Sequence, residues 1–167
     1  MQELDRWALL RLEQVKAKVT KAFEDYQFHV LYHTIHNYCT VDLSSYYLDI
    51  LKDRLYSSAP NSLERRSAQS AMYEILVDLA VMMSPILSFT TEETWQYLPK
   101  KADMPTASIQ LMPWPEARPE RFDNVLEEKW AQFIQIRSSI TKVLEGARRD
   151  KTIGHSLDAL VKLYATG

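Results

Sequence analysis

The sequence predicts an all-α protein, an antiparallel helical bundle of about five helices. Two observations predict this fold class. Apolar residues recur at spacings of three and four residues along most of the chain, which is the period of an amphipathic helix. The 167 residues include only 3 glycines and 7 prolines, so few residues interrupt the helices.

The first helix is expected to run from about Leu4 to Tyr26. The charge of Lys16 should lie off its apolar stripe. That stripe follows the helical spacing and comprises Ala8, Leu12, Val15, Val19, Ala22 and Tyr26.

The second helix is expected to run from about Phe28 to Leu55. Asp42 falls among its apolar positions, and a buried carboxylate is unfavourable without a partner. Arg137 lies in the apolar stripe of the last helix in the same way. We therefore predict a buried ion pair between Asp42 and Arg137 that sets the register of the two helices, with a direct ligand role as the alternative. The apolar face comprises Phe28, Leu31, Ile35, Cys39, Tyr46 and Ile50.

Capping signals delimit the third and fourth helices. Asn61 or Ser62 is expected to cap the third helix, and Pro85 should kink or end it. Thr90 and Glu93 have the spacing of a capping box, which predicts the start of a short fourth helix. The expected buried residues are Ala68, Met72, Ile75, Leu79, Met82 and Ile86 in the third helix, and Trp95 and Leu98 in the fourth.

A proline-rich connection precedes the last helix, which is expected from about Asp123 to Arg149. Within the connection, Ser108–Met112 is a candidate extended piece. After Gly154, the run A-L-V-K-L-Y is typical of a strand. We therefore expect the bundle over residues 1–152 and the start of a following, truncated C-terminal segment over residues 153–167.

Charge and motif content exclude several classes of protein. The net charge is −2, so any contact with nucleic acid has to be local or shared with other parts of a larger protein. The sequence contains no glycine-rich phosphate loop and no G-x-S-x-G, H-E-x-x-H or C-x-x-C motif, so no catalytic residue is predicted. A single cysteine and the absence of a long apolar run predict a cytoplasmic protein without membrane contact. We also expect a monomer.

Basic clusters are candidate phosphate contacts, although such clusters are also common on solvated helix faces. Neighbouring tyrosines, Tyr46 and Tyr47, could stack on unpaired bases or pack in the core. The candidate RNA-binding residues are Tyr46, Lys52, Arg54, Arg65, Arg66, Arg148, Arg149 and Lys151.

Three histidines, His29, His33 and His36, share one face of the second helix. They are either a polar solvated surface or part of a zinc site that lacks a fourth ligand. The solvated surface is favoured, so no metal site is predicted. Cys39 is expected to be a small core residue rather than a nucleophile.

Six segments in a fixed order carry a resemblance to a known family. The longest runs from Phe28 to Tyr56 and includes V-D-L-S-S-Y-Y-L-D-I-L-K-D-R-L-Y. The other five are L-D-R-W-A-L-L-R-L (4–12), E-R-R-S-A-Q-S-A-M-Y-E-I-L (64–76), S-P-I-L-S-F-T-T-E-E-T-W (84–95), Q-L-M-P-W-P-E (110–116) and V-L-E-G-A-R-R-D-K-T-I-G-H-S-L-D-A (143–159). Together they resemble the anticodon-binding domain of the isoleucyl-tRNA synthetase family more closely than its valyl or leucyl relatives.

The resemblance implies a role as well as a fold. It implies that the bundle holds the anticodon stem and loop of isoleucine tRNA, while the catalytic domain of the same parent chain attaches isoleucine by using ATP. ATP and zinc would belong to the full-length parent, and no cofactor is expected within these residues. The alternatives are a helical protein-interaction module and the equivalent domain of a valyl or leucyl enzyme.

The resemblance also singles out Tyr46. The family pattern usually has tryptophan at this position. Because an aromatic residue in the corresponding region of the methionyl relative contacts the anticodon, Tyr46 is the best single candidate for stacking on a base.

Overall fold

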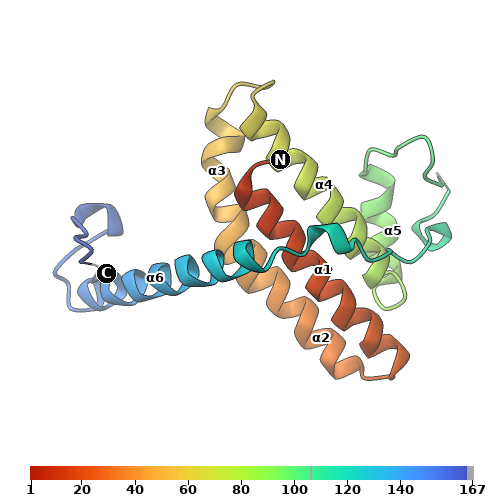
Figure 1. The fold of residues 1–167 in the computed structure, drawn as a ribbon, viewed down its shortest axis with the longest axis horizontal. Coiled ribbons are helices and arrows are strands. Elements are labelled where there is room, and N and C mark those ends of the chain that lie inside the picture. The colour runs from red at the N-terminus through yellow and green to blue at the C-terminus, as the bar shows by residue number, and fades with distance from the viewer. Residues whose placement is uncertain (106, 165–167) are drawn as a thin grey trace. The chain divides into compact units, whose positions relative to one another are not determined.

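The computed structural model describes residues 1–105 and 107–164, and every regular element within them is helical (Figure 1). The predicted all-α class is confirmed. Contacts divide the chain into two compact units, Met1–Asp123 and a second unit that begins at Asn124. The expected bundle of residues 1–152 included the last long helix, which the contacts group with the C-terminal residues. No helix in the described part of the chain is long and apolar enough to cross a membrane.

Helix α1 (Glu3–Glu24) supplies the central face of the first unit. The predicted stripe of Ala8, Leu12, Val15, Val19 and Ala22 is buried, as expected for an amphipathic helix. The prediction for its last member was wrong. Tyr26 is exposed because its φ of 56° places it in the left-handed region, where the chain turns away from the helix.

The predicted second helix is continuous but has three parts, α2 (Phe28–Asn37), the π-helix η1 (Tyr38–Tyr47) and α3 (Leu48–Ser57). A π-helix has more residues per turn than an α-helix, so the buried face rotates relative to the predicted stripe. Tyr38 and Tyr47 therefore become fully buried, while Cys39 and Asp42 are only half-buried.

Helix α4 (Leu63–Met83) begins at the predicted cap. The Oγ of Ser62 accepts a hydrogen bond from the backbone N–H of Arg65 at 3.2 Å. The helix ends just before Pro85, also as predicted, and this leaves Ile86 exposed beyond the helix rather than on its buried face.

Helix α5 (Ser88–Tyr97) begins earlier than its predicted capping box. That prediction was wrong, because the threonines lie inside the helix and bond backward to carbonyl oxygens. The Oγ1 of Thr91 donates to the carbonyl of Leu87 at 3.0 Å, and the Oγ1 of Thr94 donates to that of Thr90 at 2.8 Å. The predicted burial of Trp95 and Leu98 is confirmed.

The proline-rich connection contains two short helical turns, η2 (Ile109–Leu111) and η3 (Pro119–Arg121). The prediction of an extended piece over Ser108–Met112 was wrong, because the Oγ of Ser108 accepts from the N–H of Gln110 and starts a turn. That turn inserts Ile109 into a core cluster with Trp95 and residues of α4.

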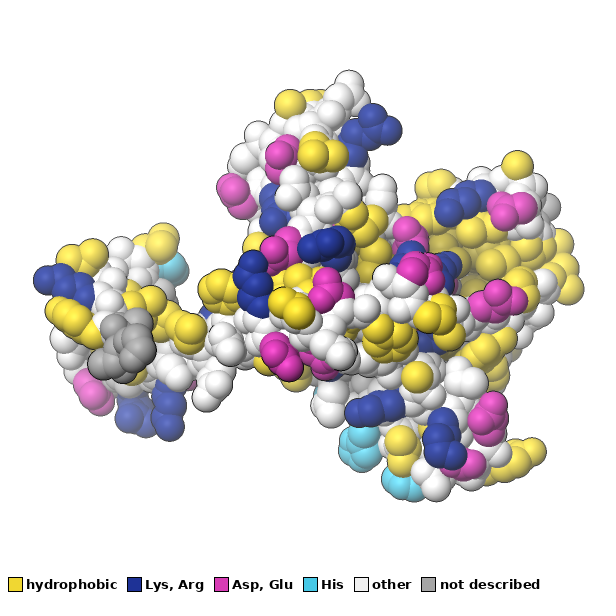
Figure 2. All heavy atoms as spheres, in the orientation of Figure 1, with side chains coloured by type: hydrophobic (Ala, Val, Ile, Leu, Met, Phe, Trp, Pro, Cys, Tyr) yellow, Lys and Arg dark blue, Asp and Glu magenta, His cyan; other side chains and the backbone are white. Residues whose placement is uncertain are grey.

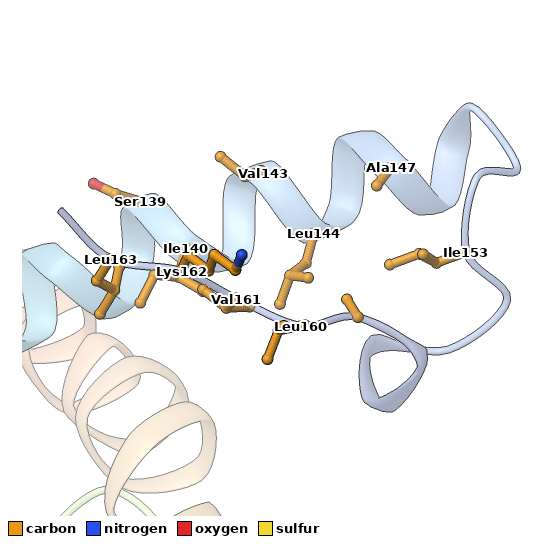
Figure 3. A pocket seen from close by; sticks show the side chains of 11 residues that line it. Ser139, Ile140, Val143, Leu144, Ala147, Ile153, Leu160, Val161, Lys162 and Leu163 are labelled. Atoms are coloured by element: carbon orange, nitrogen blue, oxygen red, sulfur yellow. The ribbon is translucent and has the colours of Figure 1, made fainter.

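The second unit consists of α6 (Asn124–Arg149), the short turn η4 (Ser156–Asp158) and an extended tail. The predicted helix bounds are confirmed to within one residue. The predicted strand after Gly154 pairs with no other strand among the described residues. Instead, as Figure 3 shows, Leu160–Leu163 run beside α6, and both segments line an apolar groove of about 390 Å³.

Candidate functional site

Four of the predicted RNA-binding cations lie at one end of the first unit, where α3 and α4 pack together and are joined by a short turn (Figure 1). We call residues 52–66 the α3–α4 tip. Arg65 links the two helices at the turn, since its Nη1 donates to the carbonyl oxygen of Ser58 at 3.3 Å. In Figure 2 this end shows Lys and Arg side chains next to acidic and apolar ones.

Two of the four cations at the α3–α4 tip contact carboxylates. The Nζ of Lys52 lies 3.1 Å from Asp49 Oδ1, and the Nη1 of Arg54 lies 3.6 Å from Asp5 Oδ2. Both side chains of the Lys52 pair are exposed, and exposed ion pairs contribute little, so a phosphate can compete for that ammonium.

The partner of Arg54 is a fully buried carboxylate. Asp5 accepts hydrogen bonds from the Tyr47 hydroxyl at 2.8 Å and from the Ser67 hydroxyl at 2.5 Å. Burial, and then the charge of Asp5, raise the pKa of the Tyr47 phenol. Arg54 therefore compensates the internal charge of Asp5, which is far from it in the sequence. A local pattern of basic residues does not reveal such a partner.

Arg65 and Arg66 are the cations of the α3–α4 tip that are least committed to acidic partners. Arg65 is half-buried, and its guanidinium bonds to a backbone carbonyl rather than to a carboxylate. Arg66 is exposed, and no side chain within residues 1–105 or 107–164 forms an ion pair with it. These two arginines are therefore the best phosphate ligands at this end.

Tyr46, the predicted stacking residue, is 7% exposed and contacts Trp7 edge to face, with ring centroids 5.3 Å apart. Its neighbour Tyr47 is fully buried. A buried ring does not offer its face to a base, so the structure favours a packing role for Tyr46. Stacking by Tyr46 stays a prediction.

The carboxylate of Asp42 has a partner that the sequence did not reveal. Arg11 of α1 donates to Asp42 Oδ2 from Nη2 at 2.9 Å and from Nε at 3.2 Å. This pair lies at the half-exposed margin of the core rather than inside it, because the π-helix turns Asp42 outward. Arg137 belongs to the second unit, and its pairing with Asp42 stays a prediction.

The remaining predicted cations, Arg148, Arg149 and Lys151, are exposed at the C-terminal end of α6 in the second unit. Arg149 Nε lies 3.9 Å from Asp150 Oδ1. Basic residues are favourable at this end of any helix because they complement the helix dipole. Their position is thus compatible with both phosphate contact and simple helix stabilisation.

A buried network of charges was missed at the sequence level. Lys16 is 2% exposed, although it was predicted to lie off the apolar stripe. Its Nζ lies 3.0 Å from Glu13 Oε1 and 2.9 Å from Asp78 Oδ2. The only hint was the spacing of Glu13 and Lys16, which puts them on neighbouring positions of one helix face.

The same network fastens the connection that contains η3 to α1 and α4. Lys16 Nζ donates to the carbonyl of Glu116 at 2.9 Å, and the N–H of Arg118 donates to Glu13 Oε2 at 3.0 Å. Arg121 pairs with both Glu13 and Glu74. Glu13, Lys16 and Asp78 are buried, and Glu74, Arg118 and Arg121 around them are half-buried. We call these six residues the buried network.

The histidine face and the cysteine are not arranged as a reactive centre. His29, His33 and His36 are exposed, and the Tyr32 ring lies 5.2 Å from His33 and 5.5 Å from His36. In the described residues, no group of three or more His, Cys, Asp or Glu side chains is placed to hold a metal ion. Burial raises the pKa of the Cys39 thiol, which disfavours the thiolate needed for nucleophilic attack.

An apolar groove of about 770 Å³ runs between α2 and the residues that follow α4. Several side chains on its walls or rim are partly exposed, which is common at surfaces that contact another protein segment. The walls include Phe28, Leu31, Tyr32, Met83, Ile86 and Leu87.

The chain is similar to known proteins over almost its whole length. Residues 5–163 match a family model described as the anticodon-binding domain of tRNA ligase. Isoleucine–tRNA ligase of Moorella thermoacetica is 52% identical over 164 residues, which are 98% of this chain and 18% of that protein. The proteins of the same name from Syntrophomonas wolfei and Geobacter sulfurreducens are 48% and 51% identical over 99% of this chain. The chain spans 18% and 17% of their lengths.

Proposed function

The chain belongs to the family of anticodon-binding domains of tRNA ligases, and we propose on that basis that it holds the anticodon stem and loop of isoleucine tRNA. The observation that carries this proposal is the identity of about half of all positions with isoleucine–tRNA ligases, over nearly the whole chain. The parent protein would attach isoleucine to its tRNA by using ATP in a separate catalytic domain. ATP and zinc would be bound by other parts of the full-length parent, and this part of the chain would be non-catalytic.

The charge distribution supports local rather than general attraction to RNA. The net charge is −2, so the chain as a whole does not attract a polyanion. The cations of the α3–α4 tip, led by Arg65 and Arg66, would neutralise phosphates at a few points. Arg148, Arg149 and Lys151 would do the same from the second unit. The tRNA and the catalytic domain of the same parent chain would be its partners, in a monomeric cytoplasmic protein.

Binding of labelled tRNA at two salt concentrations tests this proposal. Isoleucine tRNA should bind the 167-residue chain more tightly than a non-cognate tRNA, and both affinities should fall steeply with salt because phosphate contacts release counterions. Equal binding of the two tRNAs would reject the assignment to isoleucine tRNA.

A chain that binds neither tRNA at low salt would instead favour a helical protein-interaction module. The apolar groove beside α2 is the observation that would then carry the function.

A further inference from the structure

The last turn of α3 carries an exposed aromatic ring at the α3–α4 tip. Tyr56 is 84% exposed, and Leu63, at the start of α4 on the other side of the turn, is exposed as well. Single exposed apolar side chains are common, so exposure alone does not identify a site. What distinguishes Tyr56 is the set of groups around it.

One cation precedes Tyr56 on the same helix, and two more lie across the turn. Lys52 lies four residues earlier in α3, which places it on the same helix face as Tyr56. Arg65 reaches across the turn to the carbonyl of Ser58, two positions after Tyr56. Arg66, the next residue after Arg65, is exposed. An exposed ring bordered by positive charge is the combination that binds unpaired nucleotides, because the ring stacks on a base while the cations contact phosphates.

The helix that carries Tyr56 is anchored to the interior of the first unit. Leu51 of the same helix is fully buried, and Arg54 contacts the buried Asp5. Across the turn, Ser62 caps α4. The ring therefore projects from a packed helix rather than from a free loop, which limits the entropy lost when a base stacks on it.

We propose that Tyr56 is a base-stacking residue of the RNA site. Its ring stacks on an unpaired nucleotide of the anticodon loop, and Arg65 and Arg66 contact the adjoining phosphates. This inference rests on the proposed function. Tyr46, which the sequence favoured for this role, lies ten positions earlier and is buried against Trp7.

The test compares Tyr56→Ala with Tyr97→Ala, because Tyr97 of α5 is also 84% exposed but lies outside the tip. Two RNA probes are used, an anticodon stem–loop and a duplex with the sequence of its stem. Tyr56→Ala should weaken stem–loop binding about five-fold or more and leave duplex binding unchanged, since only unpaired bases can stack. Tyr56→Phe should keep the affinity, because it keeps the ring face. Tyr97→Ala should change neither affinity.

Each other result contradicts the stacking role in a distinct way. Unchanged stem–loop binding by Tyr56→Ala, with intact binding by the wild type, overturns the inference and leaves the proposed function standing. Equal weakening with both probes assigns Tyr56 to a general surface contact, which also overturns it. Loss of affinity in Tyr56→Phe assigns the effect to the hydroxyl. A wild-type chain that binds neither probe overturns the proposed function together with the inference.

Discussion

The buried network and the α3–α4 tip are both rich in charge but use it in opposite ways. In the buried network, three cations meet three carboxylates across α1, α4 and the connection before α6, and Lys16 is almost inaccessible. At the α3–α4 tip, Arg66 faces solvent, and the Lys52 pair is exposed on both sides. Charges that satisfy one another inside the fold maintain its geometry, whereas charges left without buried partners remain available to a ligand.

The position of Arg54 shows that the sequence alone does not distinguish cations with buried partners from cations at the surface. Arg54 stands two positions from Lys52 and was predicted to contact RNA with it. Its guanidinium lies beside the buried Asp5, so it belongs partly to the interior, and its contact with RNA stays a prediction. Adjacent basic residues on one helix can therefore have different roles, and the deciding quantity is the burial of the partner.

The largest expected effect comes from breaking the buried network. Lys16→Ala removes the cation between Glu13 and Asp78 and leaves the buried network with three carboxylates but only two cations. Loss of one partner from a buried ion pair typically costs about 3–5 kcal/mol. The free energy of unfolding, measured with urea, should fall by roughly that amount. Lys18→Ala, on an exposed position of the same helix, should change it by less than about 0.5 kcal/mol. Equal effects of the two variants would show that the network does not stabilise the fold.

The helices and most of their apolar faces were predictable because they depend on local spacing. The stripe of α1 from Ala8 to Ala22, the Ser62 cap and the bounds of α6 are all encoded within a few residues. The π-helix was not predictable in this way. It accommodates the packing of Tyr38 and Tyr47, which depends on residues of α1 that are distant in sequence.

The candidate site was less predictable than the fold for the same reason. The sequence singled out the basic residues that the structure gathers at the tip, and their contact with RNA stays a prediction. For stacking it named Tyr46 and did not consider Tyr56. An α-helical count cannot anticipate the π-helix η1 (Tyr38–Tyr47), which contains Tyr46 and changes the face on which its ring lies. The partners of Asp42 and Lys16 were missed because each lies on another segment of the chain.

At alkaline pH we expect an effect of intermediate size on the free energy of unfolding, and this effect comes from buried tyrosines. Burial raises the pKa of the Tyr38 and Tyr47 phenols, so the folded chain keeps protons that the unfolded chain releases above about pH 10. Their stabilising contribution is therefore complete below that pH and is lost as pH rises through the folded pKa. Each phenol should add up to about 1.4 kcal/mol per pH unit to the decline in the free energy of unfolding.

Substitution tests whether Tyr47 causes this decline. Urea unfolding at several pH values above about 9 should show a shallower decline for Tyr47→Phe than for the wild type, because one titrating group is gone. Tyr97→Phe removes the hydroxyl of an exposed tyrosine and is the matched control for the substitution. Parallel curves for the wild type and Tyr47→Phe would mean that Tyr47 titrates alike in both states.

The smallest effect is expected at the surface and bears on binding rather than on stability. Arg66→Ala should leave the urea midpoint unchanged, because no ion pair within the described residues depends on Arg66. It should weaken isoleucine tRNA and a non-cognate tRNA to a similar extent, since phosphate contacts carry no sequence information. Loss of one phosphate contact should also flatten the slope of log affinity against log salt by about 0.7–0.9. Lys18→Ala removes the same charge from α1 and controls for net charge. If its salt slope matches that of Arg66→Ala, the α3–α4 tip attracts RNA only through the overall charge, and the distinction between the two regions fails.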